Sequence, residues 1–547
     1  MKRTLIIPAA LALASAPAFA QLSTEVVVDR DIVPKERTAT RPTGLTPEII
    51  LPTPSFEPLE ADYYSRLTSV TPYFSILPPA QGAYAAEKTP YRGYVAGGYF
   101  PLLDFGVSAG YRIIDREKMA LGARLQFDSE RYRPFGEDGD MGVQYFAKAT
   151  AGVDFSWRPA DNSQLRASAD YDYLREKTTY WYPQNVNSGS IGADWHSKAG
   201  AFRYHAALKA AFEKASNTYR YLIALDESPK IDGLAQQNWL FAAGGDMLVG
   251  RSYVGLDIDG DFVHTSAPSE AYALANNATV GAVGATPYLS YSNKKFAMKL
   301  GVRLDFSRTL ASKCRFTVMP DIRLDLKPVE SLAVWAHAGG RSTTNTFKDI
   351  RQESVYQVFD HSFDISRIPF SIEGGVNVGP FSGFYMGVFG GYAIANDWLM
   401  ASNSVMHPFA ATDVKGWHAG AKAGAEWRFI KAEVKADFAP SAYDKAWYLR
   451  RDRAATVVEA TVEATPIDPL TVAVGYEFRN RRKAFLGDGD PFGLGCVSNL
   501  SAGAEWRFTK ALSVFARLEN ILGRRYMVTA LNPSRKLSGL VGASYKF

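Results

Sequence analysis

The feature that most constrains the fold of this chain is an alternation of apolar and polar residues, which recurs from about Thr89 to the carboxyl terminus. Successive side chains of a β-strand point to opposite faces, so a period of two predicts strands whose faces meet different surroundings. In the last twelve residues Leu537, Gly539, Val541, Ala543, Tyr545 and Phe547 share one face, Lys536, Ser538, Gly542, Ser544 and Lys546 share the other, and Leu540 is the exception. Segments 202–213, 253–262, 296–306 and 417–429 repeat the pattern, which predicts an all-β fold.

Ionised residues occupy the polar face of these segments. A barrel in lipid accounts for both faces, because apolar side chains then face the membrane and polar side chains face the lumen. The segments are also long enough to cross a bilayer when tilted. The candidates for the lumen face are Asp257, Asp259, Asp261, Lys299, Arg303, Asp305, His418, Lys422, Glu426 and Arg428. Each could select solutes, or could serve only as the polar lining that any wet lumen needs.

The first 20 residues are expected to be a secretory signal. Lys2 and Arg3 precede an apolar core, and Ala18-Phe19-Ala20 has the small-x-small pattern of a cleavage site. No run of 18 apolar residues follows, so no transmembrane helix is expected. An exported chain of this kind could cross a membrane only as a closed barrel.

Residues 21–88 differ from the rest of the chain in composition. Ten of the 29 prolines lie between Pro34 and Pro90. Proline lacks a backbone donor and fixes φ, so this stretch is not a series of central strands. We expect an extended periplasmic or lumenal segment, either a reduced plug or a tether. The expected division is a signal at 1–20, this segment at 21–88 and a single barrel at 89–547.

The connections between the expected strands alternate between short turns and long loops, which is the pattern of outer-membrane barrels. Trp and Phe residues stand beside the short turns and predict an aromatic girdle at 157, 195, 427, 429, 506 and 508. The sequence Ala-Gly-Ala-Glu-Trp-Arg-Phe begins at Ala423 and again at Ala502, 79 residues later, which fits four strands. Counting on that basis gives about 22 strands, with a range of 18–22. The last strand must pair with the first, near 91–100, to leave no free edge.

No catalytic or metal-binding set is recognisable. The match to G-x-S-x-G at Gly106–Gly110 lies inside an alternating segment, where the sharp turn of a nucleophile elbow is not expected. The seven histidines lack metal-ligand spacing, and a disulfide between Cys314 and Cys496 is permitted in an exported chain but not decided by the sequence. The net charge of +5 is close to balance. We therefore expect no enzyme activity, no cofactor, no metal and no nucleic-acid partner.

The stretch from Leu518 to Tyr526 resembles the segment that precedes the last strand of TonB-dependent receptors. Asn520, Arg525 and Tyr526 match that family's pattern, whereas Leu522-Gly523 replaces its Phe-Asp. The resemblance implies a 22-stranded barrel in the outer membrane of a Gram-negative bacterium. Near the other end, Thr24, Glu25, Val26, Val27 and Val28 resemble a TonB box, an extended segment that adds a strand to a periplasmic partner. A full plug domain of the family would need about twice the residues between Asp29 and Lys88, so the resemblance covers the barrel.

The predicted function is transport of an unidentified solute across the outer membrane by a TonB-receptor-like barrel. A passive porin-like channel is one alternative, and a barrel that scaffolds surface lipoproteins or outer-membrane machinery is another. The expected partners are outer-membrane lipid and the barrel-insertion machinery, with TonB or a surface lipoprotein as further candidates. Likeness to other outer-membrane barrels implies that Tyr545 and Phe547 form the signal read during assembly.

Overall fold

The structure is a computed structural model that describes most of the expected barrel. The described residues are 91–100, 104–132, 144–177, 184–217, 231–266, 278–353, 362–401, 409–440, 449, 452, 454–484, 492–529, 532–535 and 537–547. The expected signal, the proline-rich segment 21–88 and the box-like stretch 24–28 lie outside these residues.

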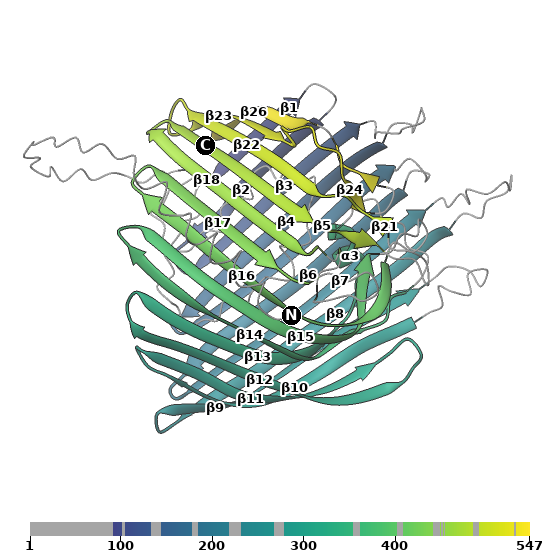
Figure 1. Cartoon of the computed structure of the whole chain (residues 1–547), viewed down its shortest axis with the longest axis vertical. Helices are drawn as coiled ribbons and strands as arrows, with labels where there is room; N and C mark the ends of the chain where they lie inside the picture. Colours follow the sequence, from purple (N-terminus) through teal and green to yellow (C-terminus); the bar gives the residue numbers. More distant parts are fainter. Residues whose placement is uncertain are drawn as a thin grey trace, which may run out of the picture. The chain divides into compact units, whose positions relative to one another are not determined.

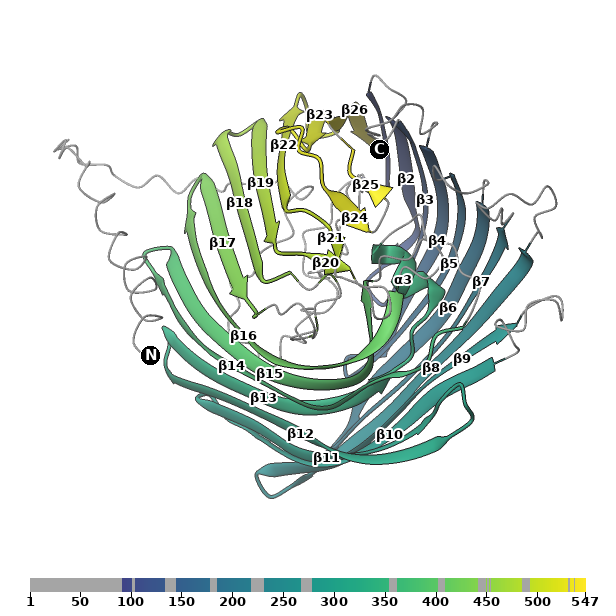
Figure 2. The ribbon, with the colours of Figure 1, turned by 45° about the vertical axis from the view of Figure 1, so that its right-hand side comes forward.

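Twenty-two strands form one closed antiparallel barrel, as the sequence predicts (Figures 1 and 2). They are β1 (Gly93–Phe100), β2 (Asp104–Arg116), β3 (Met119–Tyr132), β4 (Gln144–Ala160), β5 (Ser163–Lys177), β6 (Gln184–Ala199), β7 (Phe202–Asn217), β8 (Ile231–Val249), β9 (Ser252–Ser266), β10 (Ala278–Ser292), β11 (Phe296–Arg308), β12 (Cys314–Val329), β13 (Leu332–Thr343), β14 (Ser366–Phe381), β15 (Phe384–Ala401), β16 (Phe409–Trp427), β17 (Ile430–Phe438), β18 (Thr456–Ile467), β19 (Leu470–Asn480), β22 (Val497–Arg507), β23 (Leu512–Glu519) and β26 (Ser538–Lys546).

Short elements stand in the connections between these strands. Two small pairings, β20 (Lys483–Ala484) with β21 (Phe492–Gly493) and β24 (Met527–Thr529) with β25 (Asn532–Pro533), lie between barrel strands. The helix α3 (Phe347–Glu353) lies between β13 and β14. Within the described residues, no helix is long and apolar enough to cross a membrane.

The barrel closes where the last strand meets the first. β26 pairs with β23 on one side and with β1 on the other, from Tyr94 opposite Lys546 to Tyr99 opposite Val541. The Phe547 carbonyl accepts hydrogen bonds from the amides of Arg92 and Gly93, both at 2.8 Å, and the Phe547 amide donates to the Gly93 carbonyl at 2.9 Å. The predicted pairing of the two ends is confirmed, and it leaves neither strand with an open edge.

Leu540, the exception in the alternation of the last strand, faces the interior and packs there. Its side chain is 2 % exposed and lies in an apolar cluster with Ala96 of β1 and Phe515 of β23. Its neighbour Val541, on the outer face, is 49 % exposed. The exception therefore marks an apolar contact inside the seam, where three short strands meet.

The connections divide between two rims of the barrel. The short-turn rim carries turns of two to four residues, such as Gly250–Arg251 between β8 and β9, and the long-loop rim carries connections such as 344–365. The two copies of the repeated sequence form equivalent hairpin ends, at the β16–β17 and β22–β23 turns, and β17, β18, β19 and β22 are the four strands between them. Predicted girdle residues beside the short turns, at 157, 427, 429, 506 and 508, are between 40 and 61 % exposed.

We predict that Leu540→Ala destabilises the folded barrel by about 2–4 kcal/mol, because it leaves a cavity at the seam between β1, β23 and β26. The matched control is Val541→Ala on the adjacent, outward-facing position, for which we expect a loss below about 1 kcal/mol. Urea unfolding in lipid vesicles, followed by the heat-modifiable mobility of the folded barrel, measures both. Equal losses for the two variants would contradict the seam contact.

Candidate functional site

Charged side chains on the interior face of β9 and β11 form two groups of ion pairs. Asp257, Asp259 and Asp261 alternate along β9 with the exposed residues Val254, Leu256 and Ile258, so they lie on the opposite face. Lys299 of β11 pairs with Asp257 at 3.1 Å and with Asp321 of β12 at 2.9 Å. Arg303 pairs with Asp259 through two hydrogen bonds and with Asp305 at 3.2 Å. The structure therefore pairs five of the sequence candidates with one another, whereas the sixth, Asp261, accepts hydrogen bonds from Asn238 and Thr344.

A glycine on the intervening strand makes the Arg303 bridge possible. Gly284 of β10 lies opposite both Asp259 and Asp305 in the register, between the two carboxylates. A Cβ at this position would stand 2.1 Å from the Arg303 guanidinium carbon, so only glycine leaves room for the guanidinium to cross β10. Gly152 of β4 has the same role between Arg124 of β3 and Asp170 of β5, which form an ion pair across it.

Three of the remaining candidates, His418, Lys422 and Glu426, lie on β16, on the far side of β12–β15 from the first set. His418 is buried, and its Nδ1 lies 3.2 Å from Asp437 while its Nε2 lies 3.6 Å from Glu373. Lys422 stands opposite Lys435 of β17, and Glu426 opposite Lys431. β16 ends at Trp427, so Arg428 lies in the exposed turn and not on a strand face, unlike the segment predicted from the sequence. The ten candidates thus form two separate groups and one turn residue.

The connection between β13 and β14 turns into the barrel at the long-loop rim. Thr346 caps helix α3 by accepting a hydrogen bond from the Asp349 amide at 3.0 Å and by donating to its carboxylate at 2.6 Å. Thr344 donates to Asp261 of β9 at 2.5 Å, and the Phe347 amide donates to Gln236 of β8 at 2.8 Å. Segment 344–353 therefore contacts the interior face of strands that are not its neighbours (Figure 2).

Arg351 of α3 attaches this segment to β5 and β7. Its guanidinium lies 2.9 Å from Glu176 of β5 and 3.0 Å from Glu213 of β7, and all three side chains are buried. Phe347 and Ile350 on the same helix are fully buried. The three charged groups are removed from water and must therefore stay in contact with one another. A buried charge left without its partner would destabilise the fold by several kcal/mol. The ion pairs fix α3 across the mouth of the barrel.

Two further connections at the long-loop rim are attached in the same way. Asp452, between β17 and β18, lies 2.8 Å from Arg482 and 3.4 Å from Arg479. Burial alone would raise the pKa of the Asp452 carboxyl, but Arg482 and Arg479 outweigh it and lower that pKa to about 2. Arg535, just before β26, lies 2.6 Å from Asp104 of β2 and 2.8 Å from Glu130 of β3. Each attachment joins a connection to strand ends through a buried group of charges.

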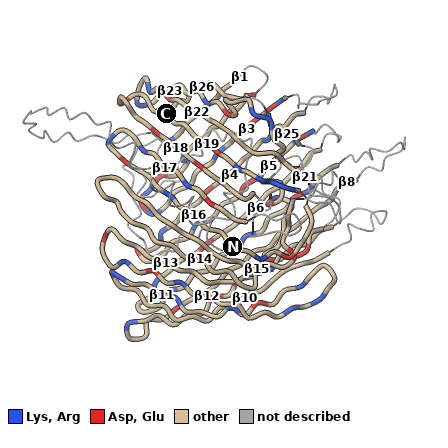
Figure 3. The backbone as a smooth tube through the Cα atoms, in the orientation of Figure 1, with Lys and Arg blue, Asp and Glu red and all other residues tan. Residues whose placement is uncertain are grey.

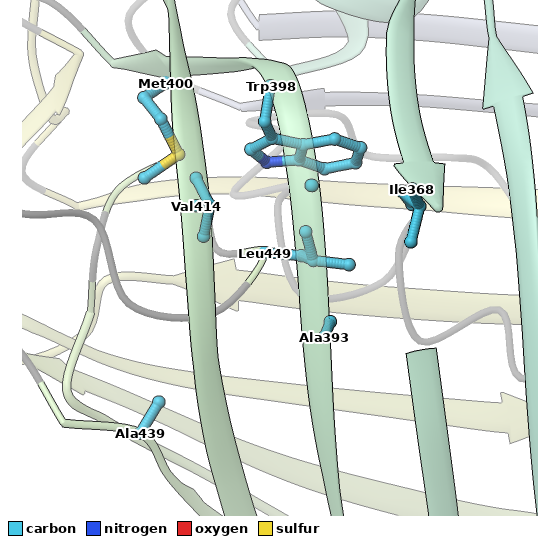
Figure 4. Close-up of a cluster of buried hydrophobic side chains, with 8 residues drawn as sticks. Ile368, Ala393, Trp398, Met400, Val414, Ala439 and Leu449 are labelled. Carbon is cyan, nitrogen blue, oxygen red and sulfur yellow. The ribbon is translucent and has the colours of Figure 1, made fainter. Parts of the chain in front are cut away.

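A cluster of buried apolar side chains packs at the long-loop rim, next to the connection that carries Asp452 (Figure 4). It gathers buried side chains from β14, β15, β16 and the β17–β18 connection: Ile368, Ala393, Ala395, Trp398, Met400, Val414, Ala439 and Leu449. Burial of this surface adds hydrophobic stabilisation to the ionic contacts. The β17–β18 connection is therefore held to the wall by both kinds of interaction.

The segment that carries the family resemblance has a structural role in the last connection. Asn520 is buried with φ at +47°, and its side chain donates to the Arg524 carbonyl at 2.8 Å and accepts from the Arg524 amide at 3.1 Å. Tyr526 is also buried, and its backbone exchanges hydrogen bonds with Ser534. The third matching residue, Arg525, is exposed. Two of the three matching residues thus shape the loop that leads into β26.

The described residues contain no other recognisable chemical site. Ser108 of the G-x-S-x-G match lies in the middle of β2 and not on a strand-to-helix turn. Cys314 and Cys496 are free thiols, so they do not form the disulfide that the sequence permitted. Within the described ranges no three His, Cys, Asp or Glu side chains stand close enough together to hold a metal ion.

We predict that Arg351→Ala releases segment 344–353 from the wall, because it leaves Glu176 and Glu213 buried together without a cation. Amide hydrogen exchange of residues 346–351, followed by mass spectrometry, should accelerate at least about tenfold. The control is Lys348→Ala on the same helix, whose ion pair with Asp172 spans 3.8 Å and is half-exposed, so exchange there should change little. Adding Glu176→Gln and Glu213→Gln to Arg351→Ala should restore part of the protection, and unchanged exchange in Arg351→Ala would refute the attachment.

A second prediction concerns acid pH and Asp452. Its lowered pKa means that the ionised carboxylate stabilises the β17–β18 connection above the ordinary pKa of 3.8 and loses this effect as pH falls through about 2. The Ala454 amide, which donates to Asp452 at 3.2 Å, should remain protected at pH 3 after correction for intrinsic exchange, and should lose protection toward pH 2. Asp452→Asn should lack this protection at every pH. Equal protection in the variant and the parent protein at neutral pH would contradict the assignment.

Comparisons with known proteins agree with this architecture. No family model and no curated protein matches the chain. Similar solved structures include the FrpB iron transporter of Neisseria meningitidis, with 11% identity and a TM-score of 0.64 over 84% of this chain and 81% of that chain. A mutant of the ferric enterobactin receptor of Pseudomonas aeruginosa has 10% identity and a TM-score of 0.61 over 83% and 80%. The copper transporter OprC has 12% identity and a TM-score of 0.58 over 83% and 80%. These proteins are TonB-dependent receptors, and the chain shares the fold of their 22-stranded barrel.

Proposed function

We propose that this protein is a TonB-receptor-like transport protein, which moves a solute across the outer membrane of a Gram-negative bacterium. The observation that carries the proposal is the position of segment 344–353, fixed inside the mouth by Arg351 between Glu176 and Glu213. A connection held inside the barrel by buried ion pairs would govern which solutes enter, which favours selective uptake over a wide passive pore. The shared fold supports the proposal without identifying the solute.

The membrane location rests on the two faces of the barrel. Large apolar side chains such as Leu208, Leu300 and Val388 are 42 to 59 % exposed on the outer face, where water would be an unfavourable neighbour. Hydrocarbon is the surrounding that suits such a face when every backbone group is paired within a closed sheet. Together with the expected secretory signal at 1–20, this supports an outer-membrane location.

The class of solute to test first comes from the similar structures. Their names describe an iron transporter, a ferric enterobactin receptor and a copper transporter. We therefore propose ferric chelates and copper ions as the first solutes to examine. The interior candidates Asp257, Asp259, Lys299, Arg303 and Asp305 would contribute to selection by charge, although they are largely paired with one another.

The energy source of transport is a separate part of the proposal. The box-like stretch Thr24–Val28 lies outside the described residues, and its resemblance to a TonB box supports TonB as a partner. An extended segment of this kind would bind by adding a strand, so its backbone matters more than its side chains. Deleting the stretch is thus a sharper perturbation than substituting within it.

We predict that deletion of residues 22–28 abolishes uptake of ⁵⁵Fe-labelled ferric chelates or of copper by cells that lack their own receptors for these solutes. Uptake by cells expressing the full chain should be lost equally when the host lacks TonB. The matched control is deletion of residues 37–43, seven residues in the same proline-rich segment, which should retain uptake. Surface expression of all variants is checked by the heat-modifiable mobility of the barrel.

The alternatives have distinct outcomes in this experiment. Uptake that survives deletion of 22–28 and loss of TonB would indicate a passive channel, which conductance of the purified protein in planar bilayers would confirm. Absence of uptake for every solute, with recovery of a surface lipoprotein in a pull-down, would favour the scaffolding function.

A further inference from the structure

The short-turn rim between β6 and β13 carries an excess of basic side chains. Four consecutive turns lie there, at 200–201, 250–251, 293–295 and 330–331. Within three residues of these turns stand Lys198, Arg251, Lys294, Lys295 and Lys327, against the single acidic residue Glu330; Arg203 is paired with Asp246 in the interior. Lys198, Arg251, Lys294 and Lys295 are exposed, and Lys327 is half-buried. We call these five residues the basic rim; Figure 3 shows the Lys and Arg positions in blue.

The neighbouring part of the same rim is balanced. Around the turns between β2 and β3 and between β4 and β5, Arg116, Lys118 and Arg158 stand beside Asp115, Glu117 and Asp161. The charge excess of the basic rim is thus a property of one sector and not of short turns in general. None of its five residues has a carboxylate within ion-pair distance among the described residues, unlike the interior cations.

The turns that carry the basic rim are fixed relative to one another. Asn293 accepts hydrogen bonds from the amides of Lys295 and Phe296, both at 2.8 Å, which sets the β10–β11 turn. The Lys327 amide donates to the Lys295 carbonyl at 2.7 Å, and the Leu248 amide donates to the Ala201 carbonyl at 3.0 Å. These bonds join adjacent turns, so the backbone positions of the five cations form a fixed array.

Aromatic side chains border the basic rim on the outer face. Phe202 and Tyr204 of β7 are 52 % and 43 % exposed, and the rings of Tyr291 and Phe296 lie 6.4 Å apart beside the β10–β11 turn. Aromatic rings prefer the level where hydrocarbon meets headgroups. Cations immediately beyond them therefore stand at the depth of lipid phosphates.

We propose that the basic rim binds the phosphate headgroups of an anionic phospholipid, of the phosphatidylglycerol type, in the membrane leaflet at the short-turn rim. The charge complements the headgroup, and the aromatic border places the cations at its depth. Each basic side chain near an anionic surface adds a modest, salt-dependent attraction, and several on a fixed array act together. This binding is independent of the solute and of the transport mechanism.

Native mass spectrometry of the purified full chain in detergent, titrated with phosphatidylglycerol and phosphatidylcholine, tests the proposal. The parent protein should retain phosphatidylglycerol roughly fivefold or more over phosphatidylcholine, and raised salt during the titration should reduce this ratio. Arg251→Gln/Lys294→Gln/Lys295→Gln should remove most of the preference. The control Arg116→Gln/Lys118→Gln/Lys510→Gln removes the same charge from other turns and should keep it.

The same measurement can overturn the proposal in three ways. The parent protein could show no preference between the two lipids, or both triple variants could lose it equally, which would indicate net charge alone. In a third titration, added lipopolysaccharide could displace phosphatidylglycerol from the parent protein but not from the variant of Arg251, Lys294 and Lys295. That result would place the basic rim in the opposite leaflet. The heat-modifiable mobility of each variant verifies that the barrel is folded, and Arg251→Lys provides a conservative variant that should retain the preference.

Discussion

Closure of the sheet is the constraint on which the rest of this structure depends. In hydrocarbon each unpaired backbone amide or carbonyl costs several kcal/mol, so a sheet that crosses a membrane must have no edge. Here the last residue takes part in the closure, because the Phe547 carbonyl accepts from Arg92 and Gly93. The seam strands β1, β23 and β26 have eight or nine residues, fewer than most others, and Leu540 adds an apolar contact on their interior face. Once the ring is closed, the alternation assigns each strand side chain to the outer face or to the interior.

The interior then has to accommodate many charges, and it does so by pairing across strands. In the middle of the wall the pairing follows from register alone: Arg303 reaches Asp259 because the intervening position, Gly284, has no side chain. At the long-loop rim the partners come from connections, and a single charged residue reaches two groups of opposite charge. Arg351 and Arg535 each meet two carboxylates, whereas Asp452 meets two guanidinium groups. Removal of one such residue would leave like charges buried together, so each connection has one strongly favoured position.

The sequence predicts the strands and short turns of the barrel well. It predicts poorly the contacts that the connections make at the long-loop rim. Strands, short turns and the closing pair follow from a period of two and from turn residues, which are local signals. The pairing of Asp257 with Lys299 is harder to predict, because it joins β9 to β11 across β10 and so depends on the register of three strands. The contact of Arg351 with Glu176 joins residues 175 positions apart, across strands that are not adjacent to β13 or β14, and no local pattern encodes it. Arg428 shows the opposite error, because the predicted segment 417–429 runs two residues past the end of β16 at Trp427.

The two kinds of pairing differ in how they can change. A pair fixed by register, such as Arg303 with Asp259, depends on three strands and on a glycine between them, so a substitution there disturbs the wall itself. An attachment such as Arg351 depends on one connection, and a different connection could present another side chain to Glu176 and Glu213 without altering the register of β5 or β7. The wall therefore tolerates little change, whereas a connection at the long-loop rim can change without altering the register of the sheet. For the proposed transport function, specificity is therefore best placed in the connections that turn inward, where a change in one residue alters the entry and leaves the closed sheet intact.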